Sequence, residues 1–293
     1  MKFFLKKLYE LIPFKKNVFI LLKKLVVLPE SIYKHLHFHG VITISAGDAH
    51  QFKMYHHGTS EENELFWAGI ENGWEKTSLK IWRKLCVEAT TVFDIGANTG
   101  LYSLITKSLN QKAQVVAFEP VPKVLEYLNY NVKLNHYDIK VVPKAASNFN
   151  GEAKVYLRKG EGFTTSVTVN KSLLAETTPK DELIIKTIRL DTFIEENKID
   201  KIDLMKIDVE THEPEVLEGM GEYLYKFKPD FLIEVWDKEC AATLNHLFKN
   251  KGYLYFDLDD KNDVITQKNE ITVSSFWNYL ICKPETAKKM GLI

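Results

Sequence analysis

At residues 91–100 the chain reads Thr91-Val92-Phe93-Asp94-Ile95-Gly96-Ala97-Asn98-Thr99-Gly100. Its first half is rich in β-branched and aromatic residues, as in a buried strand, and residues 101–109 have the apolar spacing of a helix. Between them, Gly96 and Gly100 allow the backbone to turn tightly and to come close to a ligand. The segment therefore predicts a strand, a turn and a helix whose first N–H groups can face a ligand.

The alternation of strands and helices continues along the chain. Strands are predicted at residues 114–118, 139–142 (with an extension to 146), 202–209, 231–236, 253–258 and 276–282. Helices are predicted at residues 123–134, 214–225 and 240–249. Such alternation is typical of βαβ units and a largely parallel sheet. The predicted fold class is therefore α/β, with a Rossmann-like core.

Further elements are predicted around this core. Extra strands at residues 153–157 and 183–190 flank a loop at 160–181. Upstream, residues 41–44 and 52–55 indicate a hairpin, and residues 79–86 a helix that leads into the first core strand. We therefore expect an N-terminal cap over residues 1–85 and the catalytic domain over residues 86–293.

The turn and the next strand point to a nucleoside site. The turn has the pattern Gly-x-Asn-x-Gly, and the missing third glycine argues against the pyrophosphate binding of Gly-x-Gly-x-x-Gly folds. Asp94, just before the turn, suits a cationic group such as the amino group of a methionine moiety. Glu119 ends the next strand about 20 residues past the turn, where a carboxylate can accept hydrogen bonds from both ribose hydroxyls. That position serves NAD and S-adenosylmethionine alike.

A run of ionisable residues ends the strand predicted at 202–209. It reads Lys206-Ile207-Asp208-Val209-Glu210-Thr211-His212-Glu213. Ligands of open α/β sheets bind at the carboxyl ends of the strands. Asp208, Glu210 and His212 are therefore candidates for a general base or for ligands of a divalent metal. The alternative is that acidic residues here, above all Glu213, cap the following helix.

Glu234 lies inside the apolar run at residues 231–236. A carboxylate in such a run needs a partner or a function. Glu234 is a candidate to join Asp208 in the same crevice, either in catalysis or as a second metal ligand. The alternative is a structural salt bridge, for instance with Lys206.

Taken together, these motifs resemble the FkbM-type methyltransferase family over about residues 75–240. The resemblance rests on residues 93–100, Ala117-Phe118-Glu119-Pro120, Leu134-Asn135, Ala145-Ala146-Ser147, residues 206–210 with Glu213, and Ile233-Glu234-Val235. The family has a class I methyltransferase fold, a seven-stranded, mostly parallel sheet with helices on both faces. Its members typically O-methylate hydroxyls, often of sugars or polyketide-type products. The resemblance therefore implies S-adenosylmethionine as the cofactor.

The resemblance also implies a role for each matched position. The methionine part of the cofactor would be held by Asp94, Gly96, Asn98 and Gly100. Glu119 would bind the ribose, and Ala146 with Ser147 would flank the adenine. The expected cofactor site is completed by Ala97, Tyr102, Pro120, Asn135 and Glu75, the last of which matches an upstream glutamate in Gly73-Trp74-Glu75. Asp208 would lie near the transferred methyl group.

One position departs from the family pattern and affects the acceptor side. The family usually has glycine after Val-Glu, and this chain has Thr211 there, followed by His212, a change that would reshape the acceptor pocket. The base that helps to ionise the acceptor hydroxyl is expected among Asp208, Glu210, His212 and Glu234. A Mg²⁺ ion bound by Asp208 and Glu234 is a further hypothesis, because a metal lowers the pKa of a hydroxyl. Aromatic residues that could stack on a sugar, or belong to the core, are Tyr55, Trp67, Trp74, Tyr102 and Phe163.

Composition limits the partners and the compartment. Basic and acidic residues are balanced at 39 each, which argues against nucleic acid as a partner. The three cysteines, Cys86, Cys240 and Cys282, lie far apart. This spacing argues against a disulfide framework or a structural zinc site and predicts a reducing, cytoplasmic location.

Residues 1–34 carry eight lysines and two glutamates among many apolar residues. The longest uncharged apolar run, residues 18–22, is far shorter than the roughly 20 residues of a spanning helix. A signal peptide is also a poor fit, because lysines interrupt the apolar region. The segment is predicted either to pack on the domain or to lie as a basic amphipathic helix on the inner face of a membrane.

The sequence thus predicts an S-adenosylmethionine-dependent O-methyltransferase that acts on a hydroxyl of a sugar, glycan or secondary metabolite. An NAD-dependent oxidoreductase is one alternative, because it shares the strand, the turn and the ribose carboxylate. A non-catalytic scaffold of a membrane-associated glycan-synthesis complex is another. The missing third glycine argues against the first alternative, and the intact acidic residues argue against the second.

Overall fold

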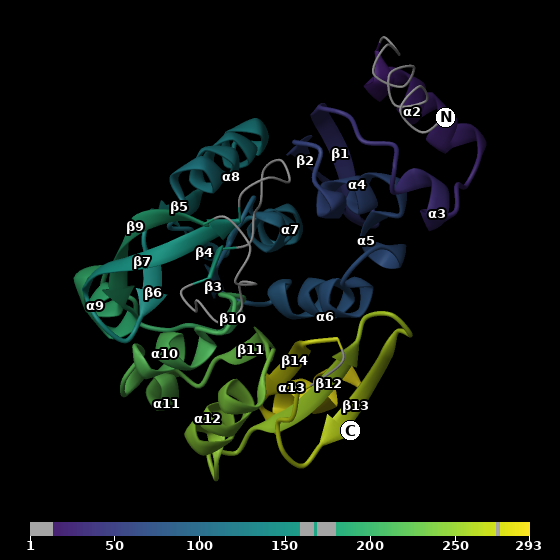
Figure 1. Cartoon of the computed structure of the whole chain (residues 1–293). Helices are drawn as coiled ribbons and strands as arrows, with labels where there is room; N and C mark the ends of the chain where they lie inside the picture. Colours follow the sequence, from purple (N-terminus) through teal and green to yellow (C-terminus); the bar gives the residue numbers. More distant parts are fainter. Residues whose placement is uncertain (1–13, 159–166, 169–179, 274–275) are drawn as a thin grey trace.

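The computed structural model describes residues 14–158, 167–168, 180–273 and 276–293. Its centre is an eight-stranded sheet with the order β13-β12-β14-β11-β10-β3-β4-β5 (Figure 1). In that order the strands are Val264–Lys268, Leu254–Asp259, Asn278–Cys282, Asp230–Glu234, Leu204–Ile207, Thr91–Ile95, Gln114–Phe118 and Ile139–Val142. The predicted α/β fold with a Rossmann-like core is confirmed.

The sheet is parallel from β11 to β5 and antiparallel among β11, β14, β12 and β13. It has one strand more than the seven predicted, since β13 pairs with β12 as an edge strand. β13 escaped prediction because most of its side chains face solvent and its sequence, VITQK, has no apolar run. The strand predicted at 202–209 ends earlier, at Ile207, so that Asp208 lies just beyond it.

The central sheet is buried on both faces. Successive residues of a strand point to opposite faces, and here both sets of side chains belong to a hydrophobic cluster. Val92 and Leu204 belong to one hydrophobic cluster, whereas their neighbours Phe93 and Met205 belong to the other. The first cluster is covered by α6 (Lys76–Cys86), α7 (Leu101–Leu109), α8 (Pro122–Asn135) and α13 (Pro284–Met290). The second is covered by α9 (Leu190–Glu196), α10 (Glu213–Glu218), α11 (Tyr223–Phe227) and α12 (Lys238–Phe248).

A second sheet has the strand order β6-β9-β7-β8. Its strands are Ala145–Ser147, Lys180–Arg189, Gly151–Arg158 and Val167–Thr168. The predicted extension of the third core strand to residue 146 is therefore wrong, because β6 leaves the central sheet to pair with β9. The loop predicted at 160–181 lies mostly outside the described residues, as does Phe163.

The helix predicted at 214–225 is also wrong in extent. It consists of two short helices, α10 and α11, with Gly221 between them in a left-handed conformation (φ 55). A continuous helix cannot pass through a residue with that backbone geometry. The chain therefore turns between the two helices instead of running straight along the sheet.

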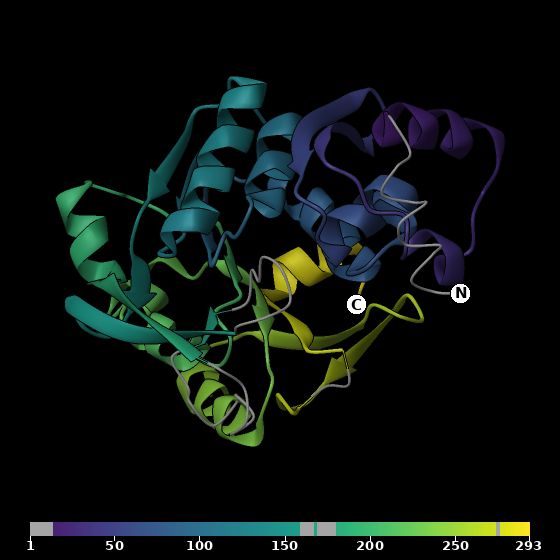
Figure 2. The same ribbon diagram turned by 45° about the horizontal axis from the view of Figure 1, so that its top comes forward.

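The N-terminal part forms the edge of the molecule that Figure 2 shows in purple and blue. It contains α2 (Lys15–Leu25), α3 (Glu30–Tyr33), β1 (Gly40–Gly47), β2 (His50–His56), α4 (Ser60–Trp67) and α5 (Gly69–Asn72). The predicted hairpin is confirmed as the antiparallel pair β1 and β2. Ile44 and Phe52 of this hairpin share a hydrophobic cluster with α7 and α8. The division into a cap and a catalytic domain stays a prediction.

Candidate functional site

The candidate site lies where the strand order of the central sheet reverses. Gly96 follows β3 and Asp208 follows β10, and these two strands are parallel neighbours. The N–H of Asp208 donates to the carbonyl of Ile95 at 3.0 Å. Gly96 has φ 77, and a Cβ at this position would lie 1.9 Å from the carbonyl oxygen of Asp208, so only glycine fits. Open α/β sheets bind their ligands at such a reversal.

A cavity of about 720 Å³ lies at this crevice. Most of the predicted site residues line it, namely Glu75, Gly96, Asn98, Glu119, Pro120, Ala146, Asp208, Glu210, His212 and Glu234. The remaining predicted residues are not on its wall, namely Asp94, Ala97, Gly100, Tyr102, Asn135 and Ser147. The structure therefore brings the acidic residues and most of the predicted cofactor residues to one cavity.

Glu119 and Asn98 form adjacent parts of the wall. The carboxylate of Glu119 accepts hydrogen bonds from the N–H of Asn98 at 3.1 Å and from that of Val121 at 2.9 Å. Burial raises the pKa of Glu119 to about 7. The Oδ1 atom of Asn98 is buried and has no hydrogen-bond partner among the described residues. A buried acceptor of this kind needs a donor, so this part of the wall fits a ligand that brings N–H and O–H groups.

Asp94 and Asn135 act on the framework of the site instead. The buried Oδ2 atom of Asp94 accepts hydrogen bonds from the N–H and the hydroxyl of Ser103, at 3.0 and 2.6 Å. These bonds tie β3 to α7. The side chain of Asn135 bonds both the N–H and the carbonyl of Lys53, which ties α8 to β2. Neither side chain is brought to the cavity, so the contacts with the cofactor expected of them are not supported.

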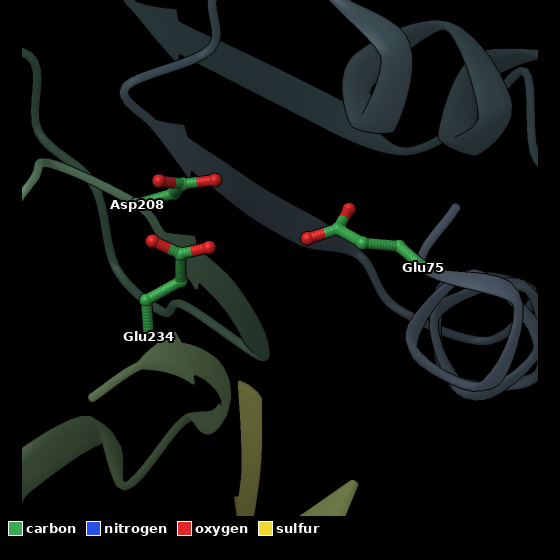
Figure 3. A group of neighbouring side chains, drawn as sticks. All are labelled: Glu75, Asp208 and Glu234. Carbon is green, nitrogen blue, oxygen red and sulfur yellow. The ribbon is translucent and has the colours of Figure 1, made fainter. Parts of the chain in front are cut away.

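Three carboxylates converge at the carboxyl ends of β10 and β11. Glu75, Asp208 and Glu234 each place an oxygen within 4.8 Å of the other two. Figure 3 shows Asp208 beside Glu234, with Glu75 pointing toward both from the other side. The ammonium group of Lys206 lies 3.2 Å from Oδ2 of Asp208, and its side chain is only 1% exposed. A buried cation thus partners the cluster.

Glu75 is the residue directly before α6 and has a left-handed backbone (φ 54). Its side chain reaches the cluster from there. Its carboxylate accepts hydrogen bonds from the hydroxyl of Tyr102 at 2.7 Å and from the side-chain amide of Asn278 at 2.9 Å. Oδ1 of Asn278 in turn accepts a hydrogen bond from Lys206 at 3.3 Å. Burial raises the pKa of Glu75 to about 7. A chain of hydrogen bonds therefore connects Glu75 to Asp208.

Glu234 accepts a hydrogen bond from Nε1 of Trp236 at 2.5 Å. Burial raises the pKa of its carboxyl well above the usual value. The alternative salt bridge with Lys206 is not found, because among the described residues Lys206 pairs with Asp208. The three carboxylates lie close enough together to hold a metal ion, but the ammonium of Lys206 already supplies positive charge beside Asp208. The predicted metal site gains no support.

The loop after Asp208 holds two further predicted residues in different ways. Glu213 is buried, and its Oε1 accepts a hydrogen bond from the N–H of Val209 at 3.0 Å, as expected of a structural residue. His212 lies on the cavity wall, with Nε2 3.0 Å from the hydroxyl of Ser147. Burial lowers the pKa of His212 below its usual value. Ser147 therefore lies behind the wall and positions His212.

Glu210 and Thr211 are consecutive residues with left-handed backbones, at φ 56 and φ 77. This conformation explains the glycine that the family usually has at the second position, since a branched side chain is disfavoured there. The left-handed conformation of Thr211 therefore introduces backbone strain, which lowers the stability of the folded protein. The loop between β10 and α10 thus holds a threonine in a backbone conformation that favours glycine.

Aromatic side chains also line the cavity. Trp236 and Trp277 stack with their ring centroids 4.6 Å apart and their planes at 16°. Both line the cavity, as does Trp74, and the side chain of Trp277 is 40% exposed. Of the aromatic residues considered from the sequence, Tyr55, Trp67 and Tyr102 do not reach the cavity wall.

Sequence reasoning missed the roles of Lys206, Asn278, Trp236 and Trp277. Asn278 lies 203 residues from its partner Glu75 along the chain. No local pattern marks such a contact. Lys206 gave a usable signal, since a lysine inside an apolar strand must find a counter-charge, yet the sequence did not show which carboxylate supplies it.

The chain is similar to several known proteins. The model of the methyltransferase FkbM domain matches residues 94–255. The methyltransferase sdnD of Sordaria araneosa is 27% identical over 188 residues, which cover 55% of this chain and 73% of that protein. The hexuronic acid methyltransferase AglP of Haloferax volcanii is 27% identical over 167 residues, which cover 57% of this chain and 64% of that protein.

Among solved structures, the methyltransferase FkbM of Methylobacillus flagellatus aligns with a TM-score of 0.42 and 14% identity. The alignment covers 66% of this chain and 43% of that chain, less than half of its length. The family match spans more than half of the 293 residues and includes both Gly96 and Asp208. The protein therefore belongs to the FkbM family of S-adenosylmethionine-dependent methyltransferases.

Proposed function

We propose that the protein transfers the methyl group of S-adenosylmethionine to a hydroxyl of a sugar. The observation that carries this proposal is the position of Asp208. Its carboxylate lies on the cavity wall beside Gly96 and is 28% exposed, whereas Glu75 and Glu234 are buried. Asp208 is therefore the carboxylate of the cluster that an acceptor hydroxyl can reach.

The cofactor would bind along the wall formed by the turn after β3 and the end of β4. Glu119 would accept hydrogen bonds from the ribose hydroxyls, and the unpartnered Oδ1 of Asn98 would accept one from the amino group. Ala146, on the same wall, would contact the adenine. When bound, S-adenosylmethionine supplies an electrophilic methyl group on a sulfonium.

Asp208 would act as the general base of the transfer. A carboxylate that accepts the hydroxyl proton as the new O–C bond forms contributes about 10²- to 10⁴-fold to the rate. Asp208 would hold the proton that the hydroxyl gives up when the methyl group passes from the sulfonium to the oxygen. Lys206 donates a hydrogen bond to Asp208 and so orients that carboxylate. His212 and Glu210, on the same wall, remain the alternative bases.

The tryptophans on the cavity wall support a sugar as the acceptor. The apolar C–H face of a pyranose can pack on the exposed indole of Trp277, while its hydroxyls bond the neighbouring carboxylates. Glu234 connects the two features, because it accepts a hydrogen bond from Trp236, the stacking partner of Trp277. The relative AglP carries the name hexuronic acid methyltransferase.

We infer that this cluster works without Mg²⁺, because Lys206 supplies a cation among the carboxylates. Activity is then expected to be unchanged in EDTA. A loss of activity that added Mg²⁺ restores would assign Asp208 and Glu234 to a metal instead.

We also infer a cytoplasmic location, because Cys86, Cys240 and Cys282 are all free thiols buried in the protein. In the described part of the chain, no helix is both long and apolar enough to cross a membrane. Any membrane contact would be peripheral and would involve residues 1–34, whose lysines can face anionic lipid.

Calorimetric titration with S-adenosylhomocysteine and, separately, with NAD tests the cofactor site. We expect S-adenosylhomocysteine alone to bind, and Glu119→Ala to weaken its binding at least about tenfold, in line with the loss of a charge-assisted hydrogen-bond pair. Glu126→Ala, on the exposed side of α8, is the matched control and should bind as the wild type does. Binding of NAD instead would favour the oxidoreductase, and binding of neither ligand would favour the scaffold.

Methyl transfer to a panel of pyranosides and to non-sugar alcohols tests the acceptor class. With the best acceptor, Asp208→Asn should lower kcat by about 10²- to 10⁴-fold, because the amide cannot take the proton. Binding of S-adenosylhomocysteine should remain within a few-fold of the wild type. If Asp208→Asn keeps wild-type kcat, the base is another residue.

A further inference from the structure

The outer face of α2 carries a row of large apolar side chains that remain exposed. This α2 stripe consists of Phe14, Val18, Leu21 and Leu25, which are 79%, 45%, 59% and 71% exposed. Val18, Leu21 and Leu25 lie in one line along the helix, because their spacing of three and four residues matches a helix that turns once per 3.6 residues, and Phe14 directly precedes the helix. Contiguous exposed apolar surface of this kind marks an interaction site.

The inner face of the same helix is packed on the protein. Phe19 is buried, and its ring lies 5.9 Å from that of Phe38 and 5.5 Å from that of Trp67. The ammonium of Lys23 lies 5.1 Å from the ring of Phe66. The helix is therefore held by one face while the α2 stripe points away from the protein. Figure 2 shows α2 at the outer edge of the molecule.

We propose that the α2 stripe is a docking surface for an anionic lipid membrane. The helix sequence KKNVFILLKKL contains four lysines and no acidic residue, although Lys23 is held on the inner face, where it donates to the carbonyl of Phe66. A helix that lies in the membrane interface buries its apolar side chains at the boundary of the acyl chains while its basic residues contact anionic headgroups. The pattern of α2 matches that arrangement.

Charge favours lipid over a protein partner for this surface. The cores of protein–protein interfaces are depleted in lysine, whereas interfacial membrane helices are rich in it. The apolar surface also continues past the helix, through Val26 and Val27, which are 45% and 100% exposed. In the sequence, residues 1–13 have the same mixture of lysine, phenylalanine and leucine. The proposal does not depend on the proposed methyl transfer.

Sedimentation of the full-length chain with lipid vesicles tests the proposal. We expect the chain to bind vesicles of phosphatidylcholine mixed with phosphatidylglycerol, and to be released by added salt, which screens the lysines. Phosphatidylcholine alone should bind it weakly. The double variant Leu21→Glu/Leu25→Glu should lower binding at least about tenfold, because two carboxylates would face the anionic surface.

Ile184→Glu is the matched control, because Ile184 on β9 is an apolar residue 61% exposed. Its binding to vesicles should equal that of the wild type. Circular dichroism and urea unfolding establish that both variants fold. No binding by the wild type, or undiminished binding by the double variant, overturns the proposal. The proposal is also overturned if the chain associates with itself without lipid and Leu21→Glu/Leu25→Glu abolishes that association. A second copy of the chain would then occupy the stripe.

Discussion

At the scale of single residues, the electrostatics of the cavity depend on Lys206. Its ammonium group is almost wholly buried and bonds Asp208 and Asn278. The nearby carboxylates favour its charged form enough to raise the pKa of Lys206 above the usual value, although burial alone would lower it. The lysine thus stays charged and supplies a cation to the buried carboxylates around it.

Replacement of Lys206 is therefore expected to destabilise the fold. Lys206→Met keeps the volume but leaves a buried carboxylate cluster without its cation, which costs about 3–5 kcal/mol when one partner of a buried pair is removed. Urea unfolding at neutral pH measures this change. The double variant Lys206→Met/Glu75→Gln should recover part of the loss, because it removes one of the carboxyls. An unchanged urea midpoint in Lys206→Met would show that the cluster is protonated without its lysine.

Thr211 gives a second prediction for a single residue, with the opposite sign. Its φ of 77 is disfavoured for a branched side chain. Thr211→Gly should raise the free energy of unfolding by about 1 kcal/mol. The relief of backbone strain stabilises the folded state, and the greater conformational entropy of glycine in the unfolded chain offsets part of that gain. Thr211→Val keeps the branch and should bring no such gain. Equal stability of the glycine and valine variants would show that the loop bears no strain here.

At the scale of elements, α10 and β6 approach so closely that only glycine fits between them. A Cβ on Gly219 would lie 2.0 Å from the carbonyl oxygen of Ser147. The backbone of Gly219 is otherwise ordinary (φ −66), so the constraint is space alone. His212, just before the start of α10, also bonds the side chain of Ser147, so both ends of the helix contact β6.

Gly219→Ala should therefore push α10 away from β6. We expect a loss of about 2–3 kcal/mol in the free energy of unfolding, as for overpacking against fixed backbone, together with weaker binding of S-adenosylhomocysteine. Gly252→Ala is the control, because a Cβ there meets nothing within 4 Å, although its φ is 77. It should cost only about 1 kcal/mol. A smaller effect of Gly219→Ala than of Gly252→Ala would contradict the close approach.

At the scale of the whole molecule, the core contains several carboxyls whose pKa burial raises. The pKa is about 7 for Glu62, Glu75 and Glu119 and about 8 for Glu213. In each case the folded pKa exceeds the unfolded one near 4.5. The folded state therefore holds protons that the unfolded state releases, and this stability is lost as the pH rises through the folded pKa.

The urea midpoint of the ligand-free protein should accordingly fall between about pH 6.5 and 8.5. Glu213→Gln should flatten this dependence, because the amide cannot ionise but can still accept the hydrogen bond from Val209. The exposed replacement Glu285→Gln should leave the slope unchanged. A midpoint that rises with pH over this range would show that these groups are ionised in the folded protein.

The sequence by itself determined the strand, turn and helix at residues 91–109, the positions of Glu119 and Asp208, and the family. These features are local: apolar periodicity, glycine spacing and the ends of strands are written in consecutive residues. The local sequence did not predict the edge strand β13, because an edge strand needs no apolar run. It also did not predict the break between α10 and α11, because the end of a helix depends on packing.

Only the tertiary structure decided which side chains share the cavity. It used Asp94 to tie β3 to α7 and Asn135 to tie α8 to β2, and it joined Glu75 to Lys206 through Asn278, 203 residues away from Glu75. It also stacked Trp277 on Trp236 beside the acidic cluster. The physical reason is that a hydrogen bond or a ring contact depends on distance in space, and chain position fixes that distance only for near neighbours.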